Sequence, residues 1–104
     1  MTVDMDTSPT ALCKVLSDPV RWRIVEALAA EELCVCHLVD DLDSPQPLIS
    51  HHLKVLREAG LVESEKHSYW TYYRLDVGAF DALASRIAEL VEPNGRSRAR
   101  RACC

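Results

Sequence analysis

Residues 45–74, PQPLISHHLKVLREAGLVESEKHSYWTYYR, restrict the fold of this chain more than any other stretch. Their first part places Ile49, Leu53 and Leu56 on one face of a helix, because apolar residues recur there at intervals of three and four. Gly60 then ends this helix, since glycine readily adopts the left-handed conformation found at helix C-termini. The remainder alternates apolar with polar residues and is rich in aromatic and β-branched types, which predicts a two-stranded hairpin.

A short helix with one polar face, followed directly by a hairpin, is the layout of a winged helix-turn-helix. In that architecture the helix enters the DNA major groove and the hairpin tip approaches the phosphate backbone. Apolar spacing and turn residues along the chain predict five helices in all, with both strands between the fourth and the fifth. The expected helices are 9–16, 19–30, 33–41, 46–59 and 77–91, and the expected strands are 61–66 and 69–75.

The fold class is therefore mainly α with one β-hairpin, in a single domain. A chain of 104 residues has room for one small domain. We expect residues 9–92 to form a winged helix-turn-helix domain for DNA binding and dimerisation. Residues 1–8 are expected to be a flexible N-terminus, and residues 93–104 a flexible basic tail that ends in Cys103-Cys104.

The composition favours a reduced, cytoplasmic protein without a membrane partner. The N-terminal MTVDMDTSPT is acidic and lacks the apolar core of a secretion signal. No stretch approaches the roughly 20 apolar residues that span a bilayer. The five cysteines are an odd number, which fits free thiols better than a disulfide framework.

The net charge of −4 is unusual for a DNA-binding protein, but it is unevenly distributed. Residues 1–45 hold three basic and nine acidic side chains, residues 46–91 five and six, and residues 92–104 four and one. The half expected to read DNA is thus nearly neutral, which fits a dimer with few phosphate contacts per subunit. The same balance leaves open a winged-helix module that binds protein instead of DNA.

Four segments in order, SDPVRWRIVEAL, ELCVCHL, QPLISHHLKVLREAGLV and YWTYYRL, resemble the ArsR/SmtB family of metal-responsive bacterial repressors. The resemblance covers residues 10–91. It implies a homodimer whose first and last helices form the interface. It also implies binding to an inverted-repeat operator in double-stranded DNA, and release from that operator when metal binds. Many relatives carry a capping serine where Pro45 stands, which makes Ser44 the alternative cap of the recognition helix.

The resemblance places the start of the recognition helix against the bases and the hairpin tip against the backbone. His51 and His52 are adjacent and point about 100° apart on a helix, so one is expected to face DNA and the other to pack or cap. Glutamine can pair with adenine through two hydrogen bonds, and lysine and arginine can neutralise phosphates. The DNA-binding candidates are Gln46, Leu48, Ser50, His51, His52, Lys54, Arg57, Lys66, His67 and Ser68.

Cys34 and Cys36 are the candidate ligands for a thiophilic ion, because thiolates are soft donors. On a regular helix, residues two apart point about 200° apart, so both could bind one ion only if the first helical turn unwinds. That unwinding would reach the recognition helix through the turn at residues 43–47. The alternative is a pair of ordinary core or surface thiols.

Relatives that sense trivalent arsenic and antimony commonly carry the run C-V-C-D-L-C, which supplies three thiolates. Here the run is CVCHLV, so Val39 stands at the third cysteine position. Cys103 or Cys104 from the tail could supply the third ligand. So could His37, or Cys13 from across the dimer, as N-terminal thiols do in cadmium- and lead-sensing relatives. Two thiolates with one exogenous ligand would also bind arsenite, but less tightly.

The sequence therefore predicts a DNA-binding repressor of a metalloid-resistance operon that As(III) or Sb(III) releases from its operator. The alternatives on the same fold are a Cd(II)- or Pb(II)-responsive repressor and a thiol-redox-responsive one. A zinc site on the last helix is not expected, because residues 77–91 contain no histidine. An enzyme is not expected either, since a thiol reductase would need a C-x-x-C motif and a βαβ pattern.

Overall fold

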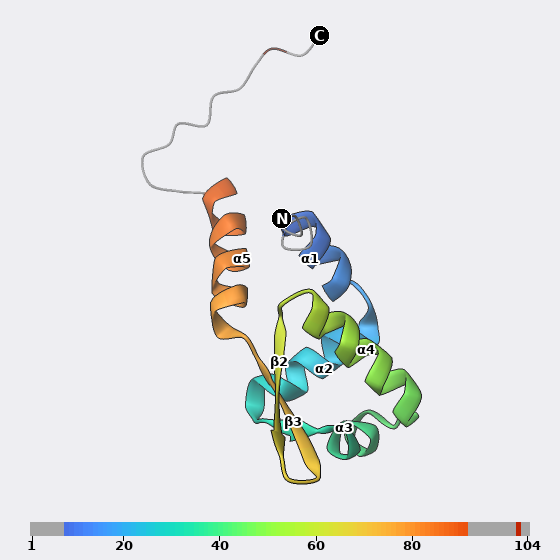
Figure 1. Ribbon diagram of the computed structural model, residues 1–104. Coiled ribbons are helices and arrows are strands. Elements are labelled where there is room, and N and C mark those ends of the chain that lie inside the picture. The colour runs from blue at the N-terminus through green and yellow to red at the C-terminus, as the bar shows by residue number, and fades with distance from the viewer. Residues whose placement is uncertain (1–7, 92–101, 103–104) are drawn as a thin grey trace.

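The computed structural model describes residues 8–91 and residue 102. The expected flexible ends thus fall almost wholly outside the described residues, as do Cys103 and Cys104. Within residues 8–91 the chain folds as a mainly α winged helix-turn-helix (Figure 1). The elements are α1 (Pro9–Leu16), α2 (Pro19–Ala30), β1 (Leu33–Cys34), α3 (Val35–Leu42), α4 (Gln46–Glu58), β2 (Val62–His67), β3 (Trp70–Leu75) and α5 (Val77–Leu90).

Local hydrogen bonds explain where the helices begin and end. The Asp18 carboxylate accepts from the backbone N–H groups of Val20 at 2.8 Å and Arg21 at 3.1 Å, which caps the N-terminus of α2. At the end of α4, Gly60 has φ 82°, and the N–H of Leu61 donates to the carbonyl of Leu56 at 3.0 Å. This is the glycine-terminated helix end that the sequence predicts.

The start of α4 differs from the alternative that the resemblance offered. Pro45 is the N-cap, and its side chain makes no capping hydrogen bond. Ser44 does not replace it, because its hydroxyl donates back to the carbonyl of Leu42 at 3.2 Å. The first amide groups of α4 thus lack a side-chain cap.

The sheet has one strand more than expected. β2 and β3 form the predicted antiparallel hairpin, and β1 pairs antiparallel with the other edge of β3, so the strand order is β1-β3-β2. In this pairing Leu33 lies opposite Tyr73 and Cys34 opposite Tyr72. The expected helix over residues 33–41 is therefore wrong at its start. Two residues carry no periodicity by which a strand could be told from a first helical turn.

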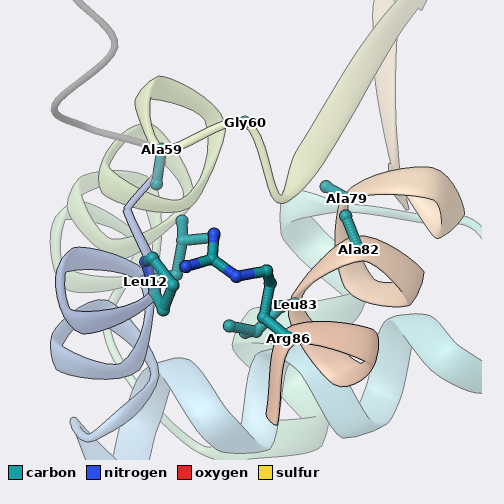
Figure 2. Close-up of a pocket in the computed structure, with 8 residues that line it drawn as sticks. Leu12, Ala59, Gly60, Ala79, Ala82, Leu83 and Arg86 are labelled. Carbon is teal, nitrogen blue, oxygen red and sulfur yellow. The ribbon is translucent and has the colours of Figure 1, made fainter. Parts of the chain in front are cut away.

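The core lies between α2, α3, α4 and the sheet, and α1 and α5 extend it at one end. Its largest fully buried side chains are Ile24, Leu38, Ile49, Leu53, Leu56 and Leu61. In contrast, α5 buries Leu83 but leaves Ile87 and Leu90 exposed, and its C-cap residue Val91 is exposed as well. A pocket of about 350 Å³ lies between α1, the end of α4 and α5, and Figure 2 shows the Arg86 side chain extending from α5 toward Leu12. None of the described helices is long and apolar enough to cross a membrane.

Candidate metal centre and nucleic-acid interface

The two candidate thiols lie side by side at the junction of β1 and α3. Cys34 is buried and extended, with φ −97° and ψ 171°, and serves as the N-cap of α3. Cys36 is exposed in the first turn of that helix, and its Sγ lies 3.0 Å from the Sγ of Cys34. The first turn of the helix expected over residues 33–41 is thus already extended at Cys34, so the two thiols come together without an ion to unwind it.

His37 completes a group of three donors. Its Nδ1 lies 3.3 Å from the Cys34 Sγ, and the ligand atoms of Cys34, Cys36 and His37 all lie within 4.8 Å of one another. The imidazole is not merely solvated, since Nδ1 accepts from the backbone N–H of Cys34 at 3.2 Å. In return the Cys34 side chain accepts from the backbone N–H of His37, so the two residues form a reciprocal cap.

The surroundings shift the pKa values of the two thiols in opposite directions. Burial raises the pKa of Cys34, but the hydrogen bond from the Cys36 thiol and those from nearby backbone N–H groups, including that of His37, outweigh burial and lower it. The pKa of Cys36 is raised, chiefly because its thiol serves as the donor to Cys34. Cys34 is thus the better thiolate of the pair, and Cys36 stabilises it by donating.

The donor chemistry suits a soft ion. Two thiolates that share one ion at about 2.3 Å in tetrahedral geometry are roughly 3.8 Å apart, so a small side-chain rotation would adapt the present 3.0 Å separation. A third thiolate is not at hand in the described part of this chain. Val39 occupies the third position on α3, and Cys13 lies on α1 beside Phe80 and Ile87 of α5. Cys103 and Cys104 lie outside the described residues.

The thiols border a groove that reaches the elements expected to read DNA. Its volume is about 420 Å³. The recognition helix contributes Gln46 to its wall, and the hairpin contributes Trp70. The full lining is Cys34, Val35, Cys36, Val39, Asp40, Gln46 and Trp70.

The predicted DNA-facing residues are exposed, with one exception. The exposed members are Gln46, Leu48, Ser50, His51, Lys54, Arg57, Lys66, His67 and Ser68. His52 instead is 6% exposed and packs in the core, where its Nδ1 accepts from the Arg21 guanidinium at 3.0 Å. The expectation that one of the two adjacent histidines packs is thus confirmed, and His52 is not placed to touch a base.

The hairpin carries a charge network that the sequence reading missed. Arg74 on β3 donates to the carboxylates of Glu63 at 3.0 Å and Glu65 at 2.8 Å on β2. Glu63 lies directly opposite Arg74 in the strand register, so a correct register would have predicted this pair. At the tip, Ser68 has φ 58°. Nε2 of its neighbour His67 lies 3.4 Å from Oε2 of Glu65.

Comparison with known proteins decides the family. Residues 18–64 match the model of the bacterial regulatory protein, arsR family. An uncharacterized HTH-type transcriptional regulator of Methanocaldococcus jannaschii is 44% identical over 80 residues, covering 76% of this chain and 85% of that protein. The chain belongs to the ArsR family. It is thus a DNA-binding transcriptional regulator and not an enzyme, as the sequence predicted.

Two further similar proteins have descriptions that name an effector class or an oligomeric state. The arsenical resistance operon repressor of Escherichia coli is 48% identical over 68 residues, which cover 64% of this chain and 58% of that protein. The chain thus spans little more than half the length of that relative. A homodimeric winged helix-turn-helix DNA-binding domain of Mycobacterium bovis superposes with a TM-score of 0.61 and 28% identity, covering 83% of each chain.

Proposed function

We propose that this ArsR-family regulator represses a metalloid-resistance operon and leaves its operator when As(III) or Sb(III) binds Cys34 and Cys36. The observation that carries the proposal is the 3.0 Å separation of the two thiols in a groove whose wall also contains Gln46 of the recognition helix. The name of the Escherichia coli relative, an arsenical resistance operon repressor, supports the same effector class.

The DNA-reading role belongs to the exposed start of α4 and the hairpin tip. Gln46, Ser50 and His51 are exposed and carry the donors and acceptors that read base edges in the major groove. Lys54 and Arg57 follow on the same helix and are suited to phosphates. Lys66, His67 and Ser68 at the hairpin tip would contact the backbone. Leu48, 38% exposed, could pack on a thymine methyl group.

A homodimer through α1 and α5 would place two recognition helices on the two halves of an inverted repeat. Support for this interface comes from the apolar side chains that α5 and its C-cap residue leave uncovered. Ile87 is 48%, Leu90 78% and Val91 70% exposed. A second groove, lined by Cys13, Leu16 and Trp22 together with residues of α5, continues the apolar surface onto α1 and α2.

Ligand binding at the thiols would disturb the recognition helix through the groove. Cys34 and His37 cap each other, so drawing the Cys34 sulfur toward an ion alters the cap at the start of α3. Asp40 and Gln46 line the same groove, so a change in the first turns of α3 reaches the start of α4 directly. A ligand releases the DNA only if it binds the DNA-free conformation more tightly than the DNA-bound conformation. The change in the cap at the start of α3 would distinguish these two conformations.

The test is a fluorescence-anisotropy titration of labelled DNA from the protein's own promoter with reduced protein. Arsenite, antimonite, cadmium, lead and zinc are then added separately. We expect arsenite and antimonite to release the DNA, and the Cys34→Ser/Cys36→Ser variant to bind DNA but not to respond. Unchanged release from that variant would refute the thiol site. Retained sequence-specific binding by a Ser50→Ala/His51→Ala variant would refute the recognition surface.

The same titration separates the alternatives. Release by cadmium or lead alone, lost on Cys13→Ser, would favour a Cd(II)- or Pb(II)-responsive repressor that uses Cys13 from the second subunit. One observation favours redox control: the sulfur atoms of Cys34 and Cys36 lie 3.0 Å apart. The two side chains would need to move little to form a disulfide bond. Release by hydrogen peroxide, reversed by dithiothreitol and absent for every metal, would establish it.

A further inference from the structure

His52 is a buried titratable side chain that neither the thiol site nor the proposed DNA contacts use. It lies on α4 and is 6% exposed, beside Ile49 and Leu53 of the same helix, which are 0% and 1% exposed. Both of its ring nitrogens face α2. Nδ1 lies 3.0 Å from Nη1 of Arg21, and Nε2 lies 3.9 Å from Oδ1 of Asp18. One imidazole ring thus stands between a cation and a carboxylate.

Each protonation state of His52 has a different partner. A guanidinium group only donates, so the contact with Arg21 requires an unprotonated Nδ1. A proton on Nδ1 makes this nitrogen a donor as well, and repulsion between two cations replaces the hydrogen bond. Arg21 is held in place, because its Nε also donates to the carbonyl of Val15 at 2.6 Å. The charged ring is attracted instead to Asp18, whose present distance of 3.9 Å is too long for a hydrogen bond.

We propose that the proton is a second effector of this regulator and that His52 is its binding site. Neutral His52, held by Arg21, keeps α4 in the position that reads DNA. Uptake of one proton from solvent at Nδ1 breaks this contact, draws the ring toward Asp18 and weakens operator binding. The inference rests on the proposed role of α4 in reading DNA, but it does not involve the thiols of Cys34 and Cys36.

The packing around His52 passes this change to the DNA-facing side of α4. Its two core neighbours on the helix leave little empty space, so a change of partner by the ring shifts the helix itself. His51 is the next residue, an exposed and proposed DNA contact, and its ring centroid lies 5.2 Å from that of His52. The Asp18 oxygen that would receive the charged ring is also the one that caps α2. Protonation therefore disturbs both α4 and the helix against which it packs.

The surroundings of His52 set this response in the acidic range. Burial has the largest effect and lowers the pKa of His52, the charges of Arg21 and His51 lower it further, and the charge of Asp18 raises it. Among the residues that the structure describes, these are the charged or titratable groups that act on the ring, two from α2 and one from α4 itself. His52 is therefore neutral near pH 7 and takes up its proton below the ordinary histidine pKa of about 6.5.

The first test is an anisotropy titration of labelled promoter DNA with reduced, metal-free protein, from about pH 7.5 to about pH 5. Wild type is compared with His52→Asn, which can accept from Arg21 but does not titrate, and circular dichroism at each pH confirms that both stay folded. One pH unit below its pKa, about a tenth of His52 is neutral. A dimer that needs both rings neutral then binds operator up to about 100-fold less tightly.

The variant His52→Asn should lack this loss of operator affinity. It keeps the exposed His51 and His67, so any proton uptake at those two residues cancels in the comparison. Equal pH dependence of operator affinity in the two proteins, at pH values below the pKa of His52, would overturn the proposal.

Two substitutions test the partners of His52. Arg21→Met should resemble the protonated wild type, with operator binding several-fold weaker already at neutral pH and a smaller further loss in acid. Asp18→Asn keeps the cap of α2 but removes the charge that attracts the protonated ring, so the loss of affinity should move to lower pH. Arg23→Met is the matched control, because Arg23 is exposed on the same helix, and it should respond like the wild type. An Arg21→Met variant that responds in the same way would overturn the role of this contact.

Linkage supplies a readout that a merely structural role would not move. If operator DNA binds the form with neutral His52 more tightly, it must also lower the pKa of His52. A proton NMR titration of the imidazole C–H resonances measures this pKa, with the His52 signal identified by its absence in His52→Asn. We expect saturating operator DNA to move the titration of His52 to lower pH, whereas the phosphate charges alone would move it to higher pH. An unchanged or raised pKa in the complex would overturn the proposal.

Failure of this inference and failure of the proposed function give different results. Cys34→Ser/Cys36→Ser should keep the full pH response. If arsenite and antimonite do not release DNA but the pH response depends on His52, the inference holds and the proposed effector is wrong. If Ser50→Ala/His51→Ala retains sequence-specific binding, α4 does not read DNA and both are wrong. If that variant loses binding while wild type and His52→Asn respond alike to pH, the inference alone is wrong.

Discussion

The Arg21 guanidinium Nη1 lies 3.0 Å from Nδ1 of His52, which joins helix α2 to the middle of the recognition helix. Because arginine donates, Nδ1 must accept, and the imidazole is neutral with its proton on Nε2. Arg21 also donates through Nε to the carbonyl of Val15 at the end of α1, at 2.6 Å. One side chain therefore ties three helices together and fixes the position of α4.

The first prediction concerns pH. Burial, together with Arg21 and His51, lowers the pKa of His52, and these effects outweigh the opposing charge of Asp18. A histidine with a lowered pKa binds fewer protons folded than unfolded, so its contribution to stability is present above its ordinary pKa of about 6.5. That contribution is lost as the pH falls below this value. We expect the free energy of unfolding from urea denaturation to decrease between about pH 7 and pH 5.

The variant His52→Asn tests the assignment, because asparagine can accept from Arg21 but does not titrate. It should cost about 1–2 kcal/mol at neutral pH and show a flatter pH profile than the wild type. His51→Asn is the matched control, since His51 is exposed and is the smallest of the causes that lower the pKa of His52, so this variant should keep most of the wild-type slope. An unchanged slope in His52→Asn would contradict the assignment.

A second prediction concerns the cap of α2. Asp18 accepts from two backbone N–H groups, and both lose their partner in Asp18→Ala. Removing an N-cap side chain costs about 1 kcal/mol, with a range of roughly 0.5–2. Asp18→Asn should retain most of this stability, because asparagine caps about as well as aspartate. Equal losses in the two variants, measured by urea denaturation at pH 7, would show that the charge matters and not the cap.

A third prediction concerns the hairpin tip. Ser68 and Tyr69 connect β2 to β3, and Ser68 has φ 58°, a left-handed conformation that side chains disfavour. Since hairpin turns of this length favour glycine at positive φ, Ser68→Gly should raise the free energy of unfolding by about 0.5–1 kcal/mol. Ser64→Gly, inside β2, is the matched control and should lower it. Both are read by thermal or urea unfolding, and a destabilised Ser68→Gly variant would contradict the account.

The features that the sequence predicted correctly are those set by neighbouring residues in the chain. The Asp18 cap and the Gly60 helix end were predictable, because residue type and near neighbours determine both. The pairing of Arg21 with His52 was not, since it joins residues 31 positions apart and neither has a periodic signature. The candidate thiols were found from their residue type. Their geometry was missed, because the strand that holds Cys34 outside the helix is only two residues long.

The last prediction separates phosphate contacts from the remaining charge of the protein. Lys54 is exposed on α4 and is proposed to contact a phosphate, whereas Lys14 is exposed on α1, the helix proposed to pair with a second copy. Each neutralised phosphate adds about one to the slope of log affinity against log salt. In a dimer with two symmetric contacts, Lys54→Ala should therefore reduce that slope by about two and weaken specific and non-specific DNA alike. Lys14→Ala should leave the slope unchanged. Anisotropy titrations at several salt concentrations measure both, and equal slopes for the two variants would remove Lys54 from the DNA interface.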